Sequence, residues 1–135
     1  MKQLFVASDA FVALNFKTSS AYDEAVGFVT GLFNETVKVY TSVGEVVKAA
    51  DSIYKLGDND KLQTFLKTLL GDSGIVVVDE QKSDMTLAID LLCKLRHSIN
   101  YSDAVMLTVM QRNGIKDIFS FNKDLKSGNV IVWPK

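Results

Sequence analysis

The amino-acid sequence predicts an α/β protein, a three-layer α/β/α sandwich around a central, mainly parallel sheet of about five strands. Strand-like and helix-like segments alternate along the chain, and this order favours a parallel sheet covered on both faces. Residues 74–78 form a continuous apolar run, as in a strand buried on both faces. With 135 residues, one proline and eight glycines, the chain has little room for a linker, which indicates a single domain over residues 1–135.

The first half of the chain is predicted to form two strands and four helices. Apolar and β-branched runs mark the strands, while Ser42 and Asp58 are cap signals before helices that end at Gly57 and Gly71. In chain order, these elements are a strand at 3–8, helices at 10–16 and 20–33, a strand at 37–40, and helices at 42–56 and 60–70.

The second half is predicted to form three strands and two helices. Met85, Leu87, Ala88 and Leu91 recur near helical spacing and predict an amphipathic helix. A second helix ends at Asn113, which a glycine follows. In chain order, these elements are a strand at 74–78, helices at 83–97 and 102–112, and strands at 118–120 and 130–133.

Composition limits the class of protein. The formal net charge is −1, so the chain lacks the basic balance typical of nucleic-acid binders, although an acidic catalytic cluster would itself lower the total. No apolar run approaches the roughly 20 residues that cross a membrane, and the N-terminal apolar segment is too short for a signal peptide. Cys93 is the only cysteine, which rules out an internal disulfide, and a cytoplasmic location is expected.

Acidic residues lie near strand-to-helix turns at both ends of the chain. Asp9 follows the first strand, Glu45 lies in the helix after the second, and Asp103 lies at the start of an apolar helix. Ligands of α/β proteins bind outside the carboxyl ends of parallel strands, so these acids are candidates for one site. Clustered carboxylates need a positive charge between them, and oxygen ligands suit Mg²⁺ or Mn²⁺. Such a site supports phosphodiester hydrolysis.

Each candidate also has a purely structural explanation. Asp9 could be a helix N-cap, and Ser42 with Glu45 has the S-x-x-E form of a capping box. Asp103 could act only through the helix dipole, with Asn100 or Ser102 as the cap. Farther along, Asn122 and Asp124 have ordinary turn chemistry. The combination, rather than any single residue, favours a functional site.

Four segments together resemble PIN domains, in particular the single-domain toxin ribonucleases of the VapC type. They are three stretches and one residue: LFVASDAFVAL at 4–14, YSDAVML at 101–107, SFNKDL at 120–125, and Glu45 after the second strand. The resemblance covers nearly the whole chain and implies a PIN-like fold and a metal-dependent endoribonuclease with Mg²⁺ or Mn²⁺. It also implies RNA as substrate, a homodimer, and an antitoxin protein as partner in a type II toxin–antitoxin pair.

The resemblance implies a role for each candidate residue. Asp9, Glu45 and Asp103 would be the catalytic acids and metal ligands. Asn122 falls where the family has a fourth Asp or Asn, with Asp124 close by; we expect Asn122 to bind metal through its carbonyl or a water, and Asp124 to supply compensating charge.

Two further residues are expected to contact substrate. Ser120 matches a Thr or Ser of the family, and Lys123 lies between two candidate site residues. The chain also departs from the family pattern: Phe11 stands where a small hydroxyl residue or Asn is usual, and Asn122 is neutral.

These departures favour the alternative function, a catalytically degenerate PIN-like module that binds RNA or a protein partner. Metal binding would separate the two functions. A zinc site is not expected, because His97 is the only histidine and Cys93 the only cysteine.

Overall fold

The computed structural model describes residues 1–96 and 98–135, and His97 lies outside the described residues. Five strands form one sheet in the order β3-β2-β1-β4-β5, and every pairing in the described chain is parallel. The strands are β1 (Gln3–Val6), β2 (Lys38–Ser42), β3 (Val76–Val78), β4 (Asp117–Phe119) and β5 (Ile131–Trp133). The predicted fold class is therefore confirmed.

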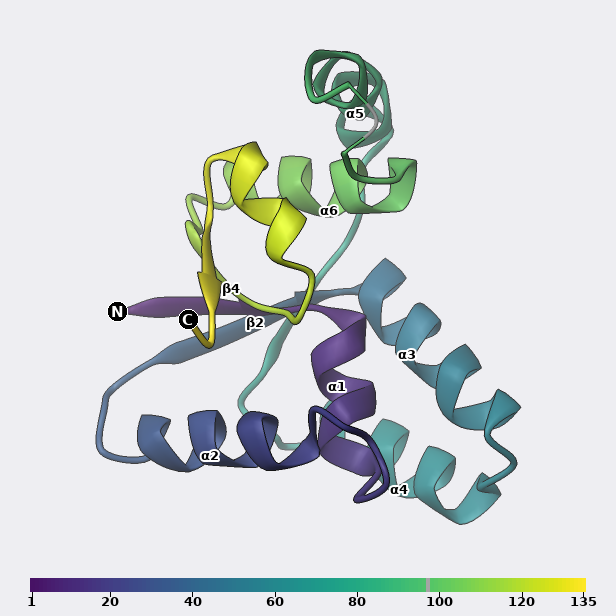
Figure 1. The fold of residues 1–135 in the computed structure, drawn as a ribbon. Helices are drawn as coiled ribbons and strands as arrows, with labels where there is room; N and C mark the ends of the chain where they lie inside the picture. The colour runs from purple at the N-terminus through teal and green to yellow at the C-terminus, as the bar shows by residue number, and fades with distance from the viewer. Residues whose placement is uncertain (97) are drawn as a thin grey trace.

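Helices cover both faces of the sheet (Figure 1). On one face lie α6 (Tyr101–Arg112), α5 (Lys82–Lys94) stacked above it, and the 3₁₀ helix η1 (Lys123–Gly128). The other face is covered by α1 (Ser8–Asn15), α2 (Tyr22–Leu32), α3 (Val43–Lys55) and α4 (Asn59–Leu70). Within the described residues, no helix is both long enough and apolar enough to cross a membrane.

Strand β1 lies at the centre of the sheet and contributes to both layers of the core. Successive side chains of a strand point to opposite faces. Leu4 and Val6 accordingly pack with α1 to α4, while Phe5 packs with α5 and α6. Burial of each large apolar side chain contributes about 1.5–3 kcal/mol, so this strand is fixed from both sides.

Several elements differ from the prediction in their bounds or type, and three of these differences have local reasons. The first strand ends at Val6 rather than at residue 8, because Ala7 caps α1 and Ser8 begins it. Helix α5 ends at Lys94 rather than at residue 97, and the nearby Arg96 has a φ of 51°, which lies outside the helical range. Residues 123–128, where only turn chemistry was expected, form η1.

Candidate active site

The candidate site lies where the order of the sheet reverses. From β1 the chain proceeds through β2 and β3 to one edge, then returns to β4 on the other side of β1. Ligands of open α/β sheets bind at such a switch point, outside the carboxyl ends of the strands. Asp9 follows β1 there, in the first turn of α1, and Ser120 follows β4.

Asp9 is held by groups that follow β4. Its Oδ2 accepts hydrogen bonds from the Ser120 hydroxyl at 3.0 Å and from the backbone N–H of Phe121 at 2.9 Å. The expected N-cap role of Asp9 is wrong, because Ala7 is the N-cap of α1. The carboxylate therefore joins β1 to β4 instead of capping its own helix.

The second oxygen of Asp9 is the most informative atom of the site. Oδ1 is buried and has no hydrogen-bond partner among the described residues. Leaving a buried polar group unpaired costs about 1–3 kcal/mol, and more if it is charged. A carboxylate oxygen held in this state at a ligand-binding edge fits the role of a cation ligand.

Glu45 is 3% exposed and points toward the turn between β1 and α1. Its Oε1 accepts from the Ser8 N–H at 2.9 Å, and its Oε2 lies 3.0 Å from Nζ of Lys48. The expected capping box is formed only in part: the Ser42 hydroxyl accepts from the Glu45 N–H at 3.3 Å, but the Glu45 carboxylate binds Ser8 and Lys48. This orientation places the Glu45 carboxylate against the backbone of Ser8, the residue before Asp9.

Asp103 completes a capping box at the start of α6. The Asn100 side chain accepts from the Asp103 N–H at 2.8 Å, and Asp103 Oδ2 accepts from the Asn100 N–H at 3.3 Å. Asn100 is therefore the cap, and Ser102 donates to it at 2.9 Å. Lys48 Nζ lies 3.2 Å from the Ser102 hydroxyl, which brings α3 and the start of α6 together.

The residues after β4 are linked to the site mainly through Ser120. This serine is 1% exposed, and its hydroxyl accepts from the Asn122 N–H at 3.1 Å while it donates to Asp9. Asn122 Oδ1 accepts from the Asp124 N–H at 3.1 Å and thereby caps η1. Asp124 is exposed, and the exposed Lys123 ammonium contacts the Pro134 carbonyl.

The donor set fits a hard divalent cation in its chemistry, because Asp9, Glu45 and Asp103 offer carboxylate oxygens only. Hydrogen bonds link the residues next to them: Glu45 accepts from the N–H of Ser8, which precedes Asp9, and Lys48 contacts Ser102, which precedes Asp103. In the described residues, however, no three Asp, Glu, His or Cys side chains approach closely enough to form a metal-binding group. Asp9 Oδ1 is the ligand position that the geometry supports directly.

Sequence reasoning missed one charged residue near these acids, Glu80. Glu80 follows β3, and its carboxylate accepts from the Gly44 N–H at 2.8 Å. A Cβ on Gly44 would lie 2.5 Å from Glu80 Oε1, so the glycine lets this carboxylate approach the start of α3. The rule that identified Asp9, an acid just after a strand, would also have identified Glu80.

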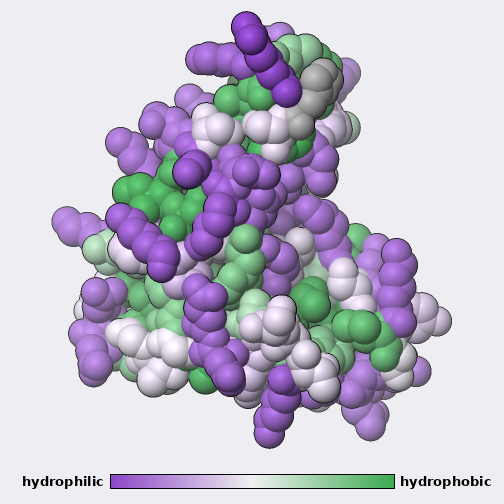
Figure 2. All heavy atoms as spheres, viewed as in Figure 1, coloured by the Kyte–Doolittle hydropathy of each residue, from purple (hydrophilic) through white to green (hydrophobic). Residues whose placement is uncertain are grey.

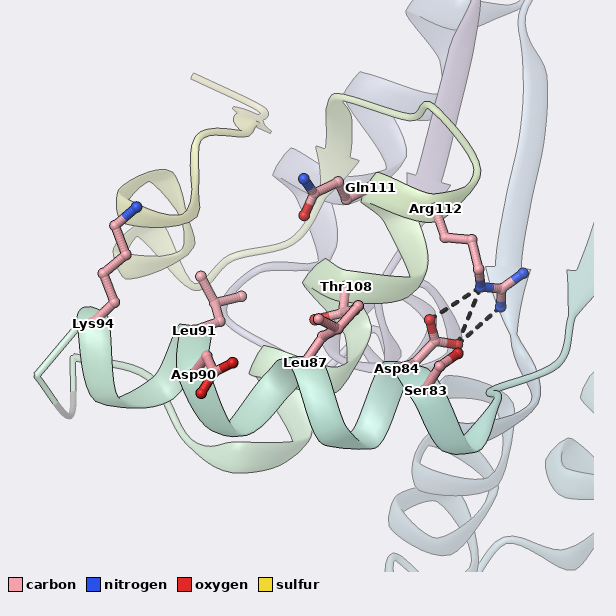
Figure 3. A pocket seen from close by; sticks show the side chains of 9 residues that line it. All are labelled: Ser83, Asp84, Leu87, Asp90, Leu91, Lys94, Thr108, Gln111 and Arg112. Carbon is pink, nitrogen blue, oxygen red and sulfur yellow. Dashed lines mark hydrogen bonds and ion pairs between the residues drawn. The ribbon is translucent and has the colours of Figure 1, made fainter.

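A separate charged pair joins α5 to α6 (Figure 3). Arg112 donates to both oxygens of Asp84, the closest contact being 2.9 Å, and Asp84 is 1% exposed. The hydrogen bonds from Arg112 hold the pKa of Asp84 below its usual range, and Asp84 raises the pKa of Arg112. The pair lines a cavity of about 410 Å³ between the two helices.

The fold defines a class, an all-parallel PIN-like α/β domain, in which Asp9 lies at the switch point of the sheet. The sequence matches no protein-family model and no curated protein. Solved structures do match, and they confirm the expected resemblance to VapC-type toxins at the level of the fold.

Three of these structures cover both chains almost completely. VapC20 from Mycobacterium tuberculosis, a sarcin–ricin loop cleaving toxin, has a TM-score of 0.78 at 17% identity, over 95% of this chain and 96% of its own. VapBC2 from Rickettsia felis, bound to a promoter DNA fragment, gives 0.72 at 14% identity over 96% of each chain. FitAcB from Neisseria gonorrhoeae gives 0.70 at 10% identity, over 96% and 95%.

Proposed function

We propose that this protein is a metal-dependent endoribonuclease that hydrolyses RNA phosphodiester bonds with Mg²⁺ or Mn²⁺. The observation that carries the proposal is the buried Asp9 Oδ1 at the switch point of the sheet, which has no hydrogen-bond partner among the described residues. The similarity in fold to VapC20, a sarcin–ricin loop cleaving toxin, supports the choice of substrate.

Neighbouring groups orient the three candidate acids, Asp9, Glu45 and Asp103, which we call the acidic edge. Ser120 and the Phe121 N–H orient Asp9, and the Ser8 N–H orients Glu45. Asn100 fixes the first turn of α6 and with it Asp103. These three acids would hold the cation, with Asn122 or Asp124 as a further ligand. When bound, the cation would supply a water of lowered pKa and neutralise charge on the phosphate.

The biological setting that we propose is the toxin of a type II toxin–antitoxin pair, acting in the cytoplasm. Solved structures of similar fold include FitAcB and VapBC2, the latter bound to promoter DNA. An antitoxin protein is accordingly the proposed partner, and Lys123 the proposed RNA contact beside the site.

We also propose a homodimer. Large apolar side chains are exposed on α3 and on α5, and Figure 2 shows hydrophobic residues reaching the surface in separate areas between hydrophilic ones. On α3 these are Val43, Val47 and Tyr54, and on α5 they are Met85, Leu87 and Ile89.

A catalytically degenerate module that binds RNA or a protein partner is the second candidate. One observation favours it: no three acids converge in the described chain, and the Glu45 charge is already paired with Lys48. In this function the acids would only cap helices and form hydrogen bonds between elements.

Cleavage of RNA separates the two candidates. Purified protein is incubated with structured and single-stranded RNA in Mn²⁺, beside an EDTA control and the variant Asp103→Asn. The ribonuclease predicts cleavage by the wild type that both controls abolish. Absence of cleavage, together with absence of Mn²⁺ binding in calorimetry, would contradict the ribonuclease and favour the degenerate module.

A further inference from the structure

Lys48 contacts two residues of this region, Glu45 and Ser102. It lies on α3, one turn after Glu45, and its Nζ is 3.0 Å from Glu45 Oε2 and 3.2 Å from the Ser102 hydroxyl of α6. A lysine free in solvent gains little from such contacts. Here the carboxylate that it pairs with is buried, at 3% exposure, while the lysine side chain is 39% exposed.

The burial of Glu45 makes this ammonium a necessary charge rather than an incidental one. A buried carboxylate without a compensating cation is strongly unfavourable. Glu45 Oε1 is satisfied by the Ser8 N–H, which carries no net charge, so Lys48 is the compensating cation that contacts Oε2. The same ammonium also contacts Ser102, which donates to the cap residue Asn100 of the helix that carries Asp103.

The two sides of the edge therefore differ in charge balance. On one side, Asp9 Oδ1 is buried without a hydrogen-bond partner among the described residues. On the other, the Glu45 carboxylate already has a fixed positive charge at 3.0 Å. A divalent cation placed beside Glu45 would have to displace or face an ammonium, whereas one placed beside Asp9 would not.

We propose that Lys48 is a resident cation of the active site, which takes the position of a second divalent ion beside Glu45. The inference rests on the proposed metal-dependent function and narrows its ligand set: the chain binds one divalent ion, on the Asp9 side, and Glu45 pairs with Lys48 instead of serving as a ligand. An ammonium has three N–H donors, of which Glu45 and Ser102 engage two, so one is left for a phosphate oxygen of the substrate.

Calorimetric titration with Mn²⁺ of the wild type and of Lys48→Met tests the proposal. Lys55→Met is the matched control, because Lys55 lies exposed on the same helix and its replacement removes the same charge. We expect one Mn²⁺ per wild-type and Lys55→Met chain. We expect Lys48→Met to take up a second Mn²⁺ or to bind the first at least about tenfold more tightly, since a competing positive charge is removed.

Stability measured in EDTA supplies an independent readout of the Lys48–Glu45 pair. Lys48→Met should lower the denaturant midpoint, because Glu45 is left buried without a cation. Glu45→Gln combined with Lys48→Met should restore most of that loss, so that the two changes are not additive.

The outcomes distinguish this inference from the proposed function. A wild type that binds no Mn²⁺ would refute the metal-dependent function and with it the prediction of one bound ion, whereas non-additive stability effects in EDTA would still uphold Lys48 as the charge partner of Glu45. Two Mn²⁺ ions bound by the wild type, identical Mn²⁺ binding in the wild type and Lys48→Met, or strictly additive stability effects would each overturn the role of Lys48.

Discussion

Asp9 is held at one oxygen, while its other oxygen has no hydrogen-bond partner among the described residues. The Ser120 hydroxyl and the Phe121 N–H fix Oδ2, so the rotamer is set before any ligand arrives. Oδ1 is then presented, buried, at the switch point. Ordering the ligand in advance lowers the entropic cost of binding a cation, which is the physical reason to place a catalytic acid in this way.

Replacement of Asp9 tests whether Oδ1 is a metal ligand. Asp9→Asn keeps the shape but removes the charge, and we expect Mn²⁺ affinity to fall by at least about tenfold, or ~1.4 kcal/mol, in calorimetry. Asp23→Asn is the control, because Asp23 is also acidic in the first turn of a helix but is exposed. Equal affinities in the two variants would remove Asp9 from the ligand set.

Replacement of Ser120 tests whether this residue positions Asp9 or contacts RNA. Because Ser120 is buried, Ser120→Ala should reduce cleavage more than RNA binding, and should cost about 1 kcal/mol of stability for the lost hydrogen bond. Cleavage rates, RNA affinities and denaturant midpoints are compared with those of Ser127→Ala, an exposed serine. A loss confined to RNA affinity would instead indicate direct contact with substrate.

At this scale the sequence identified the candidate acids but not their partners. Asp9, Glu45 and Asp103 could be chosen because they lie near strand-to-helix turns. The contact of Lys48 with Ser102 could not be foreseen, since α3 and α6 meet only in the folded chain, whereas Lys48 and Glu45 are three residues apart on one helix. Local capping rules were right for Asn100 and incomplete for Glu45, whose carboxylate is drawn to the Ser8 N–H of a neighbouring element.

At the scale of elements, one partly buried ion pair joins α5 to α6 in addition to their apolar packing. Asp84 caps the start of α5 through the Gln81 N–H at 2.8 Å and also accepts from Arg112 near the end of α6. This tie orients α6, whose first turn carries Asp103 at the site. The ion pair therefore supports the acidic edge from the other end of the helix.

Acidification and Asp84→Asn test how much the Asp84–Arg112 ion pair stabilises the fold. Because the pKa of Asp84 is lowered in the folded protein, the stabilisation is present above about pH 4, the ordinary range of Asp, and is lost as pH falls through the lowered value. Asp84→Asn should cost about 1–3 kcal/mol at neutral pH, since Arg112 is left with a weaker partner. Urea titrations from pH 7 to about pH 2 should then show a shallower acid loss than in the wild type.

Asp90→Asn is the matched control for Asp84→Asn, because Asp90 lies on the same helix and is exposed. Its stability and acid profile should follow the wild type. An Asp84→Asn profile that coincides with that of Asp90→Asn would show that the ion pair contributes nothing to the fold.

The order and type of nearly all elements were predictable, because hydrophobic periodicity and cap residues are local signals. The ends of the elements were less predictable from the sequence. The end of α5 depends on the positive φ of Arg96, and η1 depends on the Asn122 cap, which itself is oriented by Ser120. The strand order also depends on pairings between distant segments, and no local pattern encodes them.

At the scale of the whole molecule, the exposed apolar side chains of α3 and α5 bear on assembly. Ile89 is 54% exposed and Leu87 57% exposed. We expect the wild type to behave as a dimer in light scattering after size exclusion, and Ile89→Lys to shift it to the monomer, because a buried ammonium in an apolar interface is costly. Leu70→Lys is the control, because Leu70 is also an exposed apolar residue but lies on α4. A monomeric wild type would contradict the dimer.

The central claim is that the switch point of this sheet holds a catalytic divalent cation at Asp9. Crystals grown or soaked with Mn²⁺ and measured for anomalous scattering test it most directly, because the signal locates the ion without assuming a mechanism. The account predicts a single anomalous peak within bonding distance of Asp9 Oδ1, with the Lys48 ammonium still beside Glu45. A fully occupied peak elsewhere, or no peak at Mn²⁺ concentrations that support RNA cleavage, would contradict it.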